Sequence, residues 1–165
     1  MPVSVSPDDL SEILGPERFT PEKARQKLRP GVAPGLAWTA TGGDVLYIEA
    51  VELGERGRLA LTGHLGRVMR ESARAARSYL ISMAPELGLE KERLTKASVH
   101  IHVPSGAVPK DGPSAGVTMA TALASLFSHS PVRSDTAMTG EITLSGLVLP
   151  VGGIGPRTLS PSAIT

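Results

Sequence analysis

Apolar and polar residues alternate over several short stretches of the chain, which is the pattern of half-buried strands. In the clearest case, 98–103, apolar residues alternate with His100 and His102, so the two histidines face the opposite side. We predict further strands, two of them joined by the turn signal Thr41-Gly42-Gly43, and a hairpin near the end of the chain. These elements cover residues 36–39, 44–51, 58–61, a stretch near 135–139, and the hairpin 141–149.

Two other stretches repeat apolar residues at helical spacing. Residues 65–83 bring Met69, Ala73 and Leu80 to one side, and residues 117–127 are apolar almost throughout. Strands and helices are therefore mixed along the chain, but the first three strands are consecutive. This order favours an α+β fold over a doubly wound parallel sheet.

Residues 1–30 differ from the rest of the chain in their pattern of charged and apolar residues. Pro7-Asp8-Asp9-Leu10 resembles a helix start, and 17–30 carries many charges but few apolar side chains. We interpret this part as a peripheral segment that ends in a linker. The main domain is predicted to begin at Gly31.

Composition narrows the range of possible chemistries. The 165 residues suit one domain or part of one, and the net charge of +1 gives no general attraction to nucleic acid or membranes. The absence of cysteine excludes disulfides, thiolate metal sites and a cysteine nucleophile. The chain shows neither a secretory signal nor an apolar run that could span a bilayer, so we expect a soluble, intracellular protein.

The run Lys110-Asp111-Gly112-Pro113-Ser114-Ala115-Gly116 is the strongest chemical candidate. It places the Ser114 hydroxyl on a glycine-rich turn at the positive end of the predicted helix 117–127, where an alkoxide and an oxyanion are stabilised. The run also fits the G-x-S-x-G elbow of α/β-hydrolases, but prolines interrupt the preceding strand. His129 is the only histidine downstream and precedes Asp135, which is the wrong order for a triad. We therefore reject that class.

Other polar clusters give weaker signals. Lys110 beside the glycine-rich turn would suit a phosphate-binding module, but the chain lacks the Walker spacing. No carboxylate follows His100 and His102 at a zinc-like spacing, so we expect a polar strand face that lines a cleft rather than a metal site. Glu49 is either a solvent-facing residue or an acid in that cleft.

A basic stripe on the 65–83 helix is predicted to be a solvated face, and Trp38 is predicted to be a core residue. The stripe consists of Arg67, Arg70, Arg74 and Arg77.

Six segments together resemble the C-terminal proteolytic domain of ATP-dependent Lon proteases. Their order and spacing match that family nearly continuously from Gly31 to Ile154, and residues 1–30 resemble the end of the small domain of the ATPase module with its linker. By this resemblance, residues 31–165 form an incomplete proteolytic domain. The segments are Gly35-Leu36-Ala37-Trp38-Thr39, Thr62-Gly63-His64-Leu65-Gly66 with the following 68–72, His100-Ile101-His102-Val103-Pro104, the run 109–116, Ala137–Leu144 and Leu149–Ile154.

The resemblance implies a fold like the second domain of ribosomal protein S5 and a serine–lysine dyad, in which a lysine amine takes the serine proton. Ser114 matches the nucleophile and Thr139 a threonine that helps to hold the lysine. The polar residues that line or order the site match Glu49, His100, His102 and Asp111.

The resemblance also implies the setting of the whole protein. Members of the family form homo-hexameric rings that degrade misfolded and regulatory proteins, and their ATPase module uses ATP and magnesium. We expect no cofactor or metal in this chain, unfolded proteins as partners, no membrane or nucleic acid partner, and a cytoplasmic location, with the mitochondrial or peroxisomal matrix as the alternative.

The sequence departs from the family after Ile154. The dyad lysine should be the third residue after this isoleucine, but the position holds Arg157, and arginine keeps its proton up to a pKa of about 12 or more. Pro156 and Pro161 also disfavour the expected helix. This abrupt change is typical of a frameshift, a misjoined exon or a sequencing artefact. The family has roughly one further helix–strand–helix unit after this point, and its absence here is expected to leave apolar sheet surface uncovered. We expect little or no peptidase activity from the chain as written; the alternative is a non-catalytic fragment that assembles with full-length subunits.

Overall fold

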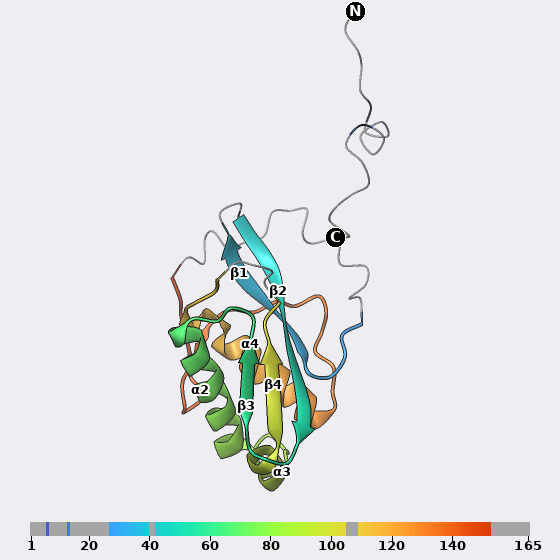
Figure 1. Cartoon of the computed structure of the whole chain (residues 1–165), viewed down its shortest axis with the longest axis vertical. Coiled ribbons are helices and arrows are strands. Elements are labelled where there is room, and N and C mark those ends of the chain that lie inside the picture. The colour runs from blue at the N-terminus through green and yellow to red at the C-terminus, as the bar shows by residue number, and fades with distance from the viewer. Residues whose placement is uncertain (1–5, 7–12, 14–26, 40–41, 105–108, 153–165) are drawn as a thin grey trace, which may run out of the picture.

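The computed structural model describes residues 27–39, 42–104 and 109–152, together with Ser6 and Ile13. Within these residues, four strands form one sheet, two long helices pack on one of its faces, and two short strands form a separate hairpin (Figure 1). This is a mixed α+β architecture, as predicted. Its elements are β1 (Val32–Thr39), β2 (Gly42–Gly54), β3 (Leu59–Thr62), α2 (Arg67–Met83), α3 (Lys91–Lys96), β4 (Ser98–His102), the 3-10 turn η3 (Pro113–Ala115), α4 (Gly116–Ser128), β5 (Glu141–Ile142) and β6 (Val148–Leu149).

The strands of the sheet lie in the order β1-β2-β4-β3. β2 is antiparallel to both of its neighbours, whereas β3 and β4 are parallel. A parallel pair needs a crossover, and here α2 and α3 provide it. The sheet is thus mixed, and it is not the doubly wound parallel sheet that the sequence disfavoured.

The core lies between the sheet and helices α2 and α4. Alternate residues of the strands point inward, so Ile48 and Ile101 are fully buried. Ala73 and Leu80 on α2 are buried at helical spacing, as the periodicity predicted. In Figure 1, α4 runs behind β3 and β4, which leaves the other face of the sheet toward the viewer. We call the helix-covered side the inner face and the other side the outer face.

Two predictions about local structure need correction, and one element was missed. The strand near 135–139 is wrong: only Met138 pairs with the sheet, through one isolated bridge to Gly35 on β1. Its backbone N–H donates to the Pro34 carbonyl at 3.2 Å, and its carbonyl accepts from Leu36 N–H at 3.0 Å. Gly42 and Gly43, predicted in a turn, belong to β2. The short helix α3, which buries only Leu94, was not predicted, because one buried apolar residue leaves no periodicity to detect.

The predicted hairpin over 141–149 is confirmed by the pairing of β5 with β6. Its turn contains Gly146 with φ +85°, where a side chain would be strained and would also overlap Tyr79. Some predictions lie outside the described residues: the segment before residue 27 apart from Ser6 and Ile13, the Trp38 side chain, and the tail with Pro156, Arg157 and Pro161. None of the helices in the described part of the chain has the length and apolar character needed to cross a bilayer.

Candidate functional site

Ser114 lies half-buried in the 3-10 turn that leads directly into α4. The turn begins after Gly112, whose φ of +122° favours glycine. The Ser114 carbonyl accepts two hydrogen bonds, one from Gly140 N–H at 2.9 Å and one from the Thr139 hydroxyl at 3.3 Å. The residues predicted as nucleophile and dyad-holding threonine are therefore neighbours, although 25 positions separate them in the sequence.

The amino end of α4 gives this turn its electrostatic character. α4 has 13 residues and no acidic residue in its first turn, so its positive end is not neutralised from within the helix. Aligned peptide dipoles favour negative charge at such an end. Gly116 lets the helix start close to the hairpin, since a Cβ there would lie 2.9 Å from Ile142 N. A hydroxyl at this place is well situated to become a nucleophile and to leave an oxyanion near the helix end.

Asp111 joins this turn to the amino end of α2. Its Oδ1 accepts hydrogen bonds from Met69 N–H and Gly112 N–H, both at 2.9 Å. Met69 is the third residue of α2, and the N-cap position is Gly66, which has no side chain to cap the helix. The Asp111 carboxylate therefore takes over the role of an N-cap from a distant part of the chain. Gly66 makes room for it, because a Cβ there would overlap the carboxyl carbon of Asp111.

These bonds also determine the charge of Asp111. The Met69 N–H bond, followed by the Gly112 N–H bond, lowers the pKa of the Asp111 carboxyl below its usual value, and desolvation opposes them only in part. A carboxylate that is ionised and engaged in this way is a positioning group rather than a proton acceptor. Asp111 thus connects the amino end of α2 with Gly112, at the start of the turn that carries Ser114.

The two histidines share one hydrogen-bond partner on the outer face of the sheet. Thr62 Oγ1 lies 2.8 Å from Nε2 of His100 and 2.7 Å from Nδ1 of His102. A hydroxyl has one proton, so it can donate to only one ring and must accept from the other. Glu49 on β2 pairs in register with His102, which places it on the same face. The prediction that the histidines face away from the buried residues of β4 is confirmed.

The predicted site residues thus form two groups. Ser114, Thr139 and Asp111 lie around the amino ends of α4 and α2, whereas His100, His102 and Glu49 lie on the outer face of the sheet. Thr62 and Gly66 contact members of these groups and were missed as individual site residues. Both lie in a segment that carried the family resemblance, but only the folded chain shows what they touch. Among the described residues, no group of three or more histidines and carboxylates could hold a metal ion.

The basic stripe on α2 is only partly a solvated face. Arg67, Arg70 and Arg74 are exposed, as predicted. Arg77 contradicts the prediction: its guanidinium donates to the carbonyl of Gly57 at 3.0 Å and to that of Ala97 at 2.8 Å. Burial lowers its pKa from the usual value. It ties α2 to the segments on either side of the crossover, which the sequence spacing alone could not reveal.

A serine on a glycine-rich turn at the amino end of a helix is an arrangement that serine hydrolases use. The family model of the Lon protease (S16) C-terminal proteolytic domain matches residues 4–163, and the chain belongs to this family. The matched residues extend beyond 31–154, the stretch on which the resemblance rested.

Curated relatives agree with this assignment. The chain is 65% identical over 159 residues to the Lon protease of Nitrosococcus oceani, covering 96% of this chain and 21% of that protein. It is 58% identical to the Lon protease of Anaeromyxobacter dehalogenans, with 95% and 19% covered, and 52% identical to that of Aquifex aeolicus, with 96% and 20% covered. The chain therefore spans about a fifth of the length of these relatives.

Proposed function

We propose that this chain carries the nucleophile half of the peptidase site of an ATP-dependent serine endopeptidase, with Ser114 as the nucleophile. The observation that carries the proposal is the position of Ser114: half-buried, at the amino end of α4, with its carbonyl held by Gly140 and Thr139. Membership of the Lon proteolytic family supports it. The finer fold class, similarity to the second domain of ribosomal protein S5, is part of the proposal and is supported by the mixed sheet with helices on one face.

The chemistry follows from this position. The Ser114 oxygen attacks the carbonyl carbon of the peptide bond, while a base accepts the hydroxyl proton. The positive end of α4 stabilises the oxyanion, and the protonated base then gives its proton to the leaving amine. Water releases the acyl group from Ser114 in a second step. The base of a serine–lysine dyad has to be a neutral amine.

Arg157 occupies the position of that lysine, outside the described residues. Because arginine stays protonated, it cannot take the Ser114 proton. We therefore propose that the chain as written has little or no peptidase activity. Thr139 would help to hold the amine if a lysine were present, and Asp111 positions the turn. Glu49, His100 and His102 would order the site from the outer face of the sheet.

The setting of the activity is likewise a proposal that rests on the family. Unfolded proteins are the proposed substrates, homo-hexamers the assembly, and the cytoplasm the location. ATP and magnesium would act in the ATPase module of the whole protein and not in the residues of this chain.

A second candidate is a non-catalytic subunit that joins full-length partners. It is favoured by the apolar residues that the hairpin exposes, among them Leu144 at 64%, Leu147 at 63% and Val148 at 55%. Co-expression with a full-length relative tests it: the tagged chain should co-purify in the ring, and a Leu147→Ser/Val148→Ser variant should be depleted from it. Recovery of the ring without the tagged chain would contradict this candidate.

A pair of chimeras tests the main proposal. In the first, residues 4–154 replace the matching segment of the Nitrosococcus oceani relative, which keeps its own sequence thereafter. We expect ATP-dependent degradation of casein, and we expect Ser114→Ala to reduce it by at least about a thousandfold. The second chimera carries residues 4–163, including Arg157, and should be inactive. Degradation by the Ser114→Ala chimera, or by the second chimera, would overturn the roles of Ser114 or of the lysine position, respectively.

A further inference from the structure

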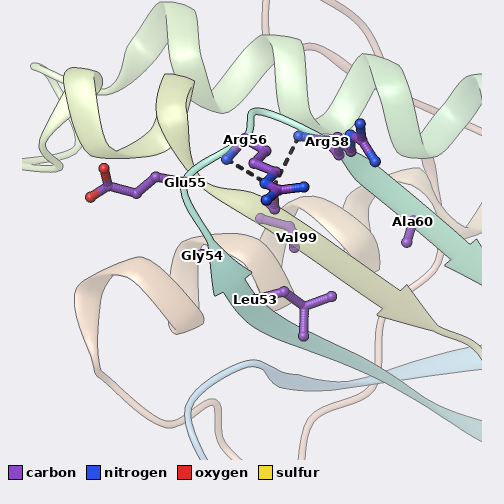
Figure 2. Close-up of a pocket in the computed structure, with 8 residues that line it drawn as sticks. Leu53, Gly54, Glu55, Arg56, Arg58, Ala60 and Val99 are labelled. Carbon is purple, nitrogen blue, oxygen red and sulfur yellow. Dashed lines mark hydrogen bonds between the residues drawn. The ribbon is translucent and has the colours of Figure 1, made fainter.

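The regular pairing of the sheet is interrupted at one end of its outer face. β2 loses its regular register with β4 between Glu52 and Gly54, and Gly54 has a φ of +129°. The chain that follows is held to the start of β4 by the Ser98 hydroxyl, which accepts from Arg56 N–H at 3.1 Å and from Arg58 N–H at 3.3 Å. The result is a depression of about 490 Å³ between the end of β2 and the start of β3 (Figure 2).

Two cations without an acidic partner border this depression. The side chains of Arg56 and Arg58 are exposed, and neither forms an ion pair within the described residues. Among the described residues that line the depression, Glu55 is the only acid, and its carboxylate points away from both arginines (Figure 2). The bonds to Ser98 use backbone N–H groups, so neither guanidinium group spends a donor on Ser98, and neither is paired with an acid of the described residues.

The depression also has an apolar end. Leu53 is 64% exposed and, with Ala60 on β3, lies further along the strands from the arginines (Figure 2). Val51, the next residue of β2 on the same face, is 49% exposed. A charged end and an apolar end therefore lie side by side on one face of the sheet.

We propose that this surface, the Arg56–Arg58 depression, binds an acidic peptide segment in extended conformation. Carboxylates of the segment pair with the two guanidinium groups, whose planar donors suit bidentate bonds to carboxylate oxygens. Every second side chain of an extended segment points the same way, about 6.6 Å apart, so an apolar side chain two positions from a carboxylate packs on Leu53. The described residues of the lining include no aromatic side chain on which a nucleotide base would stack, which favours a peptide over nucleic acid. This binding is independent of hydrolysis at Ser114.

The experiment measures fluorescence anisotropy of a labelled peptide of repeating Glu-Ser-Leu-Ser, titrated with the full 165-residue chain. We expect Arg58→Glu to weaken binding by about tenfold or more, and rising salt to weaken it as well. Arg74→Glu makes the same charge change on an exposed part of α2 and should leave binding within about twofold. Leu53→Ser should weaken binding without altering its salt dependence. All the substituted side chains are exposed, so thermal melting should show that the variants fold.

Several outcomes would overturn the proposal. Equal binding of a Lys-Ser-Leu-Ser peptide would show that the depression does not recognise the carboxylates. Equal losses in Arg58→Glu and Arg74→Glu would show that only net charge matters. Tighter binding of a single-stranded DNA oligonucleotide of the same length would identify nucleic acid as the partner instead.

Discussion

The inner and outer faces of the four-stranded sheet are built from alternate residues of the same strands, and they have opposite physical characters. On β2 and β4, Ala50 and Ile101 face inward and are almost fully buried, whereas the adjacent pair Val51 and His100 faces outward. The inner face is fixed by packing against α2 and α4. The outer face keeps exposed apolar and polar groups that do not contribute to the core. Burial against the helices is therefore concentrated on one side of each strand, and within the described residues the other side carries more exposed groups.

The largest expected effect comes from a substitution on the inner face. Ile101→Ala removes a fully buried side chain, and the cavity should lower the free energy of unfolding by about 2–5 kcal/mol. Val51→Ala, on the neighbouring strand but facing outward, should lower it by less than about 1 kcal/mol. Urea denaturation of both variants measures the difference. Equal losses would show that the outer face is covered in solution and contributes to stability as the inner face does.

The second-largest expected effect tests whether Arg77 stabilises the fold through its hydrogen bonds or is a solvated residue. Arg77→Met keeps most of the apolar stem but leaves the carbonyls of Gly57 and Ala97 without their donors. We expect a loss of about 1–3 kcal/mol in the free energy of unfolding, because the part-buried Ala97 carbonyl then lacks its donor. Arg74→Met, one turn earlier and exposed, should change it by less than about 0.5 kcal/mol. Similar values for both variants would place Arg77 with the solvated arginines, as the sequence had predicted.

A third effect concerns the contact between Gly66 and Asp111. Gly66 has φ −70°, so alanine fits its backbone, but the added Cβ would overlap the Asp111 carboxyl group. Gly66→Ala should therefore cost about 1–3 kcal/mol, through the forced shift of the turn that carries Ser114. Gly152→Ala is the matched control, since a Cβ there meets nothing within 4 Å. Equal unfolding curves for the two variants would show that the turn is not held against α2.

The sequence predicted the inner face well because periodicity reports burial. The alternation around His100 and His102 and the spacing in α2 both repeat a pattern that the core imposes on one side of an element. Contacts made by single residues leave no such pattern. Arg77 looked like its solvated neighbours, and the bond from Met69 to Asp111 joins residues 42 positions apart. The stretch near 135–139 was predicted as a strand, yet only Met138 reaches the sheet, and the exposed Arg133–Asp135 pair precedes it.

The candidate site was predictable only in part, for the same reason. The turn around Ser114 was recognisable from its local glycine, proline and helix signals. The roles of Thr62 and Gly66 depend on the meeting of distant segments. The Arg56–Arg58 depression arises from a register shift in β2, and a shift between paired strands has no local signature.

The smallest expected effect is the dependence of stability on the charge of Asp111. Asp111→Ala removes the acceptor of Met69 N–H and Gly112 N–H, so its melting temperature should fall below that of the unaltered chain. Asp111→Asn keeps an oxygen acceptor but no charge and should lie between the two. Asp44→Asn, which removes an exposed carboxylate on β2, serves as the control for net charge.

The pH dependence of the melting temperature distinguishes the contribution of the Asp111 charge from that of the side-chain shape. Folding lowers the pKa of Asp111, so the ionised form stabilises the native state fully above the unfolded pKa of about 3.9. This contribution is lost as the pH falls through the lower pKa of the folded state. The difference in melting temperature between the unaltered chain and Asp111→Asn should therefore be constant near neutral pH, shrink below about pH 4 and vanish in stronger acid. A difference that persists unchanged in acid would mean that Asp111 holds the Ser114 turn by its shape alone, and that the ionised carboxylate at the end of α2 contributes nothing.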